Sequence, residues 1–134
     1  MFIETSAIIA ILADEPEAPG FLAQIDSAPR RRTGAHVRLE VTINLARILG
    51  LGTMDAHEVY DTFLAEAGIT VIPITDAVSR QAVQAFATYG KGQHHPAQLN
   101  FGDCLSYACA FNDCDTILFK GRDFSKTDLA SAPL

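Results

Sequence analysis

The sequence lacks a long apolar run, a basic leader segment and paired cysteines. Its longest uncharged apolar run near the start, Thr5 to Ala13, is too short to span a bilayer, and no basic segment precedes it. The three cysteines form an odd set without a CxxC spacing, which argues against a disulfide framework and against a metal site built on thiolates. These absences predict a cytoplasmic protein with no membrane segment.

Basic residues are also in the minority, because ten Lys and Arg stand against sixteen Asp and Glu, for a net charge of -6. This balance argues against a protein that coats nucleic acid by bulk electrostatics. It does not exclude a nuclease, since an enzyme that holds divalent metals must gather carboxylates in its site. We interpret the triple arginine at 30–32 as a solvated loop.

A chain of 134 residues with 49% hydrophobic content can bury the core of one ordinary domain, which we expect to span residues 1–134. Strand and helix patterns alternate along it. Strands are predicted at 1–4, 69–74 and 116–121, and helices at 7–15, 37–49, 55–67, 76–89 and from 101 onward, with helical turns near 21–27. Thr5 or Ser6 is expected to cap the first helix. This alternation predicts an α/β fold with a central, mostly parallel sheet and helices on both faces.

Four acids stand where such a fold gathers function, at the carboxyl ends of strands or the starts of helices. Glu4 closes the first strand, Asp123 follows the last, Asp103 begins a helix, and Glu40 lies among apolar helix residues. Each also has a structural explanation, as a surface acid, a polar helix face, a turn or a cap. If they converge, their repulsion requires a cation, and hard oxygen ligands select Mg²⁺ or Mn²⁺.

The stretch LNFGDCLSYACAF, residues 99–111, shows how one acid can serve both purposes. Asn100 can be the N-cap and Asp103 can complete a capping box three residues later. Because a carboxylate has two oxygens, Asp103 can cap its helix and ligate a metal together. The small residues after the cap, among them Gly102, predict a helix that lies close to the sheet.

The motifs FIETSAIIAILADEPEA, LNFGDCLSYACAF and ILFKGRDFSKTDL, in this order, resemble the PIN-domain ribonucleases of the VapC toxin group. The resemblance covers nearly the whole chain. It implies a PIN-like fold, Mg²⁺-dependent endoribonuclease activity with RNA as substrate, and the role of toxin in a type II toxin–antitoxin module. It also implies a VapB-type antitoxin partner and a homodimer. We expect the antitoxin to bind a hydrophobic groove near AIIAIL and FLAQI.

Carried over residue by residue, the resemblance assigns catalysis and metal binding to Glu4, Glu40, Asp103 and Asp123. Thr5 and Ser6 match the small hydroxyl residues beside the first acid, where a hydroxyl can bond to a ligand carboxylate or a metal-bound water. Asp128 is expected to be a local cap or surface acid. His94 and His95, in a loop before a proline, are not assigned to catalysis.

Glu4 departs from the family pattern, which usually has Asp there, and the extra methylene keeps open a catalytically weakened, PIN-like binding module. A phospho-receiver domain is a second alternative. That class needs an acceptor Asp at the end of a central strand, and the one candidate, Asp76, is better explained as a helix cap. Its other point of similarity is a lysine after the last strand, here Lys120. Metal-dependent RNA cleavage distinguishes the nuclease from both alternatives.

Overall fold

The computed structural model describes residues 1–131, so the last three residues of the expected domain lie outside the described part. Within it, four parallel strands form a sheet in the order β3-β2-β1-β4. Their bounds are β1 (Phe2–Ile3), β2 (Arg32–Gly34), β3 (Thr70–Ile72) and β4 (Ile117–Leu118). The central strand β1 pairs with both neighbours, so that Phe2 is in register with Arg32 and with Ile117.

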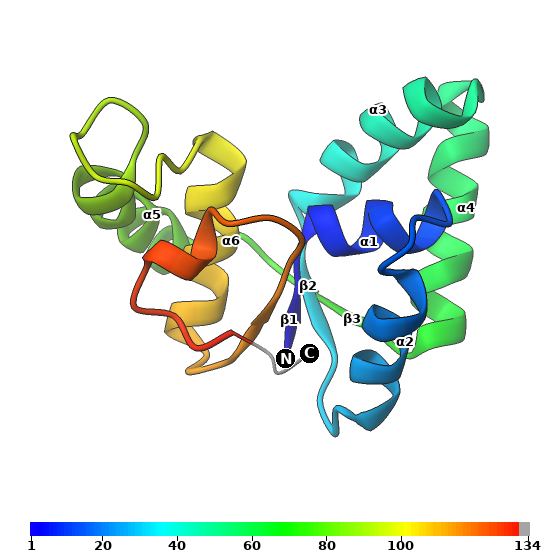
Figure 1. Cartoon of the computed structure of the whole chain (residues 1–134), viewed down its shortest axis with the longest axis horizontal. Helices are drawn as coiled ribbons and strands as arrows, with labels where there is room; N and C mark the ends of the chain where they lie inside the picture. The colour runs from blue at the N-terminus through cyan, green and yellow to red at the C-terminus, as the bar shows by residue number, and fades with distance from the viewer. Residues whose placement is uncertain (132–134) are drawn as a thin grey trace.

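Helices lie on both sides of this sheet: α5 and α6 on one side, and α1, α2, α3 and α4 on the other (Figure 1). Their bounds are α1 (Thr5–Leu12), α2 (Ala18–Ser27), α3 (Val37–Leu49), α4 (Thr53–Ala67), α5 (Asp76–Tyr89) and α6 (Phe101–Asn112), followed by the 3₁₀ helix η1 (Phe124–Lys126). The predicted fold class is therefore confirmed. Because helices cover both faces, β1 and β4 consist of buried apolar residues throughout. No helix of residues 1–131 is both long and apolar enough to cross a membrane.

Local chemistry explains where the helices begin and end. Gly50 and Gly68 end α3 and α4 with φ of 64° and 66°, in the left-handed region that glycine adopts without a steric cost. Thr75 caps α5 by accepting the backbone N–H of Val78. The predicted capping box of α6 is confirmed, since Asn100 accepts the N–H of Asp103 and Asp103 accepts the N–H of Asn100. The helices α3 to α6 follow the predicted ranges closely, whereas α1 begins two residues earlier than predicted and ends at Leu12.

The second strand of the chain, β2, and the arginines at 30–32 differ from the sequence-based prediction. Strand β2 was not predicted, and the arginines beside it were expected in a solvated loop. Instead Arg32 pairs with Asp113 and Asp115 at 2.9 and 2.7 Å, and Arg31 donates to three backbone carbonyls. The interpretation as a solvated loop was wrong for these two residues, because both are half-buried and both guanidinium groups are bound by other parts of the chain.

Two further expectations are corrected. The strand at 69–74 is shorter, and β3 is a mostly exposed edge strand, because only β2 pairs with it. The N-cap of α1 is Glu4 rather than Thr5 or Ser6, since the Glu4 side chain accepts the backbone N–H of Ser6.

Candidate active site

The four acids singled out from the sequence meet at the carboxyl edge of the sheet. Glu4 directly follows β1, and Glu40 stands in the first turn of α3, which begins shortly after β2. Asp123 follows β4, and Asp103 stands in the first turn of α6. Their charges interact, because Asp103 and Glu40 both raise the pKa of Glu4, and Asp123 and Glu40 both raise that of Asp103. We call these four residues the acidic cluster.

Glu4 is the most buried member, with 4% of its surface exposed. Burial, reinforced by the neighbouring acids, raises its pKa to about 7 although Ser6 bonds to it. Ser6 donates both its backbone N–H and its hydroxyl to Oε2, at 2.8 and 2.5 Å. Since both bonds fall on Oε2, the other oxygen, Oε1, is the one free to take a proton or a ligand.

Glu40 is held by the other hydroxyl of the pair, because Thr5 donates to its Oε1 at 2.9 Å. Burial raises the pKa of Glu40 and the Thr5 bond opposes that shift. The two hydroxyl residues after β1 therefore bond to different acids: Ser6 orients Glu4, and Thr5 orients Glu40. The resemblance had placed both hydroxyls beside the acids without deciding which acid each one serves.

Asp103 combines the cap with a place in the acidic cluster. Its Oδ2 accepts the N–H of Asn100 at 3.1 Å, and 9% of the residue is exposed. Burial, together with Asp123 and Glu40, raises its pKa to about 6 despite the capping bond. Asp123 itself is exposed and precedes η1. Two buried acids and two more accessible ones thus share this edge.

Among residues 1–131, no Lys or Arg lies within 4.0 Å of these four carboxylates. In the same part of the chain, no three His, Cys, Asp or Glu side chains stand close enough, as placed, to hold a metal ion. The donor set nevertheless fits a hard divalent cation, because buried carboxylates that repel one another and lack a basic partner are stabilised by one. To bind one cation together, the carboxylates of the acidic cluster must move closer to one another than they are in this structure.

His36 is a neighbour of the acidic cluster that sequence reasoning missed. Its Nε2 lies 2.8 Å from Ser106 Oγ and 3.9 Å from Glu40 Oε1. Its Nδ1 is buried without a hydrogen-bond partner in the described chain, which favours the tautomer with the proton on Nε2. Burial lowers the pKa of His36 to about 4, so the ring is neutral at pH 7. His36 therefore contributes an N–H near Glu40 without neutralising it.

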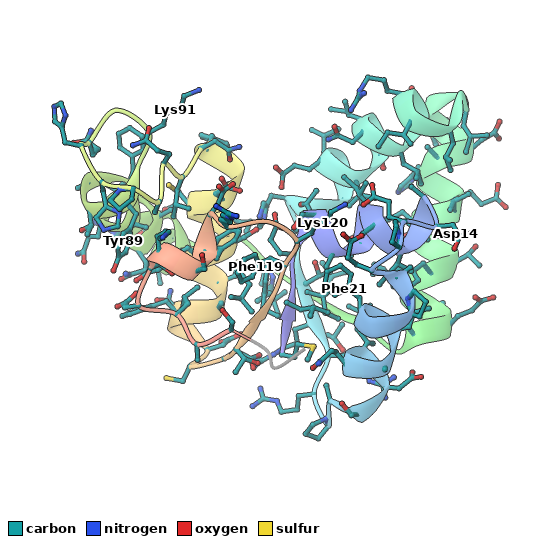
Figure 2. The ribbon with its side chains drawn as sticks, in the orientation of Figure 1. Asp14, Phe21, Tyr89, Lys91, Phe119 and Lys120 are labelled. Atoms are coloured by element: carbon teal, nitrogen blue, oxygen red, sulfur yellow. The ribbon has the colours of Figure 1, made fainter. Side chains whose placement is uncertain are left out.

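Lys120 links the last strand to the first acid through its backbone. Its N–H donates to Ser6 Oγ at 2.8 Å, so the chain after β4 supports the hydroxyl that orients Glu4. Figure 2 shows Lys120 between the two groups of helices, beside α1. Its ammonium group pairs with Glu15 and, at 3.4 Å, with Glu17, rather than with the acidic cluster.

The remaining singled-out residues lie outside the acidic cluster. His94 is exposed, and His95 packs edge-on against Tyr89 while its Nδ1 accepts the N–H of Ala97. Asp128 accepts the hydroxyl of Tyr107 and so fastens the chain after η1 to α6. Asp76 is 79% exposed at its side chain and pairs with Arg80 in the same helix, a position that gives no support to a phospho-receiver.

In residues 1–131, the large hydrophobic side chains that are well exposed lie on elements other than α1, although a groove was expected near that helix. Most of the AIIAIL stretch is buried or half-buried in the core. Two adjoining pockets of about 350 and 250 Å³ share Phe101 and Leu105 between α3, α5 and α6. A third, of about 520 Å³, takes only Leu12 from α1 and is otherwise formed by Leu51 and α4. A groove near AIIAIL and FLAQI therefore stays a prediction, and Leu12 is the residue by which α1 takes part in one of these three pockets.

Comparison with known proteins yields consistent matches. The family model described as PIN domain matches residues 1–129. Ribonuclease VapC28 of Mycobacterium tuberculosis is 40% identical over 132 residues, which cover 98% of this chain and 97% of that protein. The solved structure of the sarcin-ricin loop cleaving toxin VapC20 of M. tuberculosis has a TM-score of 0.78 at 20% identity, over 98% of both chains. A toxin–antitoxin complex from Klebsiella pneumoniae has a TM-score of 0.68 at 17% identity, over 95% of this chain and 92% of the other.

Proposed function

This chain belongs to the PIN-domain family, and from that premise we propose that residues 1–134 form one PIN domain that acts as a divalent-metal-dependent endoribonuclease of the VapC type. The observation that carries the proposal is the pair of buried acids, Glu4 and Asp103, which meet Glu40 and Asp123 without a basic partner in the described chain. Such repulsion destabilises the fold, and carboxylates with pKa values raised in this way are concentrated at functional sites. The ribonuclease names of the relatives support RNA as the substrate.

We propose that the metal is Mg²⁺ or Mn²⁺ and that Glu4, Glu40, Asp103 and Asp123 bind it. When bound, such an ion polarises a phosphoryl oxygen and lowers the pKa of a bound water. The residues of the chain supply the orientation. Ser6 fixes Oε2 of Glu4 and leaves Oε1 free, and the capping bond occupies Oδ2 of Asp103 and leaves Oδ1 free. We propose that the protein acts in the cytoplasm, on RNA present there.

RNA cleavage tests this proposal directly. The purified protein is expected to cut RNA internally with added Mg²⁺ and to stop when EDTA removes it. Binding of RNA without any cleavage in Mg²⁺ or Mn²⁺ contradicts the nuclease and favours the weakened binding module. Labelling of Asp76 by a small phosphodonor supports the phospho-receiver instead.

The antitoxin is proposed to bind the pocket formed by Leu12, Leu51 and α4. Its apolar wall includes Val59 and Phe63, and its remaining lining carries Asp55, Glu58 and Glu66 with no basic residue. This chemistry fits an amphipathic segment with apolar and basic side chains. A small protein captured from native cells should inhibit RNA cleavage, and Val59→Asp should abolish its capture. Equal capture by the variant contradicts this location.

Self-association is proposed through the face between α3, α5 and α6. Leu39, Val83 and Phe101 on this face are 64%, 70% and 85% exposed. Apolar residues make up most of the lining of its two pockets, which also includes Ser79, His36 and Glu40. Sedimentation should show a dimer that Phe101→Asp converts to a monomer. The matched control is Leu22→Asp on α2, an exposed leucine outside this face, which should leave the dimer intact. A parent protein that sediments as a monomer contradicts this proposal.

A further inference from the structure

The carboxylate of Glu40 lies against the first turn of α6, in the space that a side chain at position 102 would occupy. A Cβ atom built on Gly102 would stand 2.1 Å from Oε2, 2.7 Å from Cδ and 3.0 Å from Oε1 of Glu40. These three atoms are its nearest neighbours, and all belong to one carboxylate. A side chain at position 102 would therefore exclude the Glu40 carboxylate from its present position.

The backbone does not explain the glycine. Gly102 lies in α6, outside the positive-φ residues of the described chain, and alanine is favoured over glycine in a helix by up to about 1 kcal/mol. Close packing of α6 on the sheet, which the small residues of this helix predicted, does not explain position 102 either. The atoms that a Cβ would meet are those of Glu40, not those of a strand.

We infer that Gly102 is a positioning residue for the acidic cluster: its missing side chain admits the Glu40 carboxylate to the start of α6, beside Asp103. Thr5 holds that carboxylate from the other side through the 2.9 Å bond to Oε1. Gly102 and Thr5 together fix the distance between the acids that α3 and α6 carry. The inference rests on the proposed function, because it treats Glu40 as a metal ligand.

The test compares metal affinity with metal-free stability in Gly102→Ala. The Glu40 side chain is 33% exposed, so its carboxylate can swing toward solvent when a Cβ displaces it. We expect Mn²⁺ affinity, measured by titration calorimetry, to fall at least about tenfold, the usual effect of losing a group that orients a ligand. The urea midpoint without metal should stay equal or rise. The matched control is Gly20→Ala on α2, where an added Cβ meets nothing within 4 Å, and which should leave Mn²⁺ affinity unchanged.

A double-mutant cycle with Glu40→Asp separates positioning from general damage. Asp is one methylene shorter, so its carboxylate withdraws from position 102. Glu40→Asp alone should weaken Mn²⁺ binding, and adding Gly102→Ala to it should cause no further loss. Thr5→Val, which keeps the shape and removes the hydroxyl, should also weaken Mn²⁺ binding.

Three results overturn the inference. They are unchanged Mn²⁺ affinity in Gly102→Ala, an equal further loss when the alanine is added to Glu40→Asp, and a metal-free Gly102→Ala protein that is less stable than its parent or does not fold. The last result would show that the position serves packing. In each case the parent still binds Mn²⁺ and cleaves RNA, so the proposed function stands. A parent protein that binds no Mn²⁺ overturns both.

Discussion

Removing the charge of Asp103 should stabilise the protein while it abolishes activity. The pKa of Asp103 is raised from 3.8 to about 6, chiefly by burial. One pKa unit corresponds to about 1.4 kcal/mol, so the ionised carboxylate costs the fold about 3 kcal/mol at pH 7. Asn removes that cost and keeps an oxygen for the Asn100 N–H, so the loss of capping is at most about 1 kcal/mol. The net expectation is a gain of about 2 kcal/mol.

The sign of the pH dependence follows from the same shift. Between pH 4 and pH 6 the folded protein binds more protons at Asp103 than the unfolded chain does, so the stability of the parent falls as the pH rises through this window. Asp103→Asn lacks that dependence. Its advantage should therefore be near zero at pH 4 and fully developed at pH 7.

Urea unfolding at both pH values in EDTA measures this difference. The control is Asp76→Asn, which also changes a first-turn aspartate but at an exposed position, and it should stay within about 0.5 kcal/mol of the parent. Added Mg²⁺ should raise the melting temperature of the parent and not that of Asp103→Asn. A variant less stable than the parent at pH 7, or one that cleaves RNA at the parent rate, refutes the reasoning.

Three other predictions use contacts at different places. Glu4→Asp should preserve or increase Mg²⁺-dependent RNA cleavage, because Asp has the usual length of the family and also caps helices well; a rate at least tenfold lower contradicts this. Tyr107→Phe removes the bond to Asp128 and should lower the free energy of unfolding by about 2 kcal/mol with unchanged cleavage, as urea melts and RNA assays can check. Burial raises the pKa of Asp115, but the N-terminal ammonium and Arg32 outweigh it and lower the pKa overall, so this acid stabilises the fold above pH 4. Asp115→Asn should lower the free energy of unfolding at pH 7, and this free energy should fall less steeply than that of the parent as the pH is lowered. An acid transition identical to that of the parent contradicts this prediction.

Local signals account for what the sequence predicted well. The glycines after α3 and α4, and the Asn100–Asp103 pair before α6, each act within a few residues, so their effect is visible in a short stretch of sequence. The places of the four acids at strand ends and helix starts follow from the alternation of strands and helices. The catalytic assignment of those acids stays a prediction.

Non-local contacts account for what was missed. Strand β2 is three residues long, and its half-buried Arg32 pairs with acids more than eighty positions away, so nothing near it in the sequence indicates a strand. His36 and Gly102 acquire their relation to Glu40 only when α3 and α6 come together. The N-cap at Glu4 was missed because glutamate rarely caps a helix in this way.

The pairing of β1 with β4 has a consequence for how the protein is made. Phe2 and Ile3 leave the ribosome long before their partners Ile117 and Leu118 have been synthesised. Until then, the nascent chain has neither the β1–β4 pair nor Asp123, and Ser6 lacks the Lys120 N–H. At translation rates of about 5–20 residues per second, this delay lasts for several seconds. A chain that stalls before residue 117 therefore carries Glu4, Glu40 and Asp103 without Asp123 and without the strand β4 that pairs with β1, so the proposed metal site stays incomplete until both have been made.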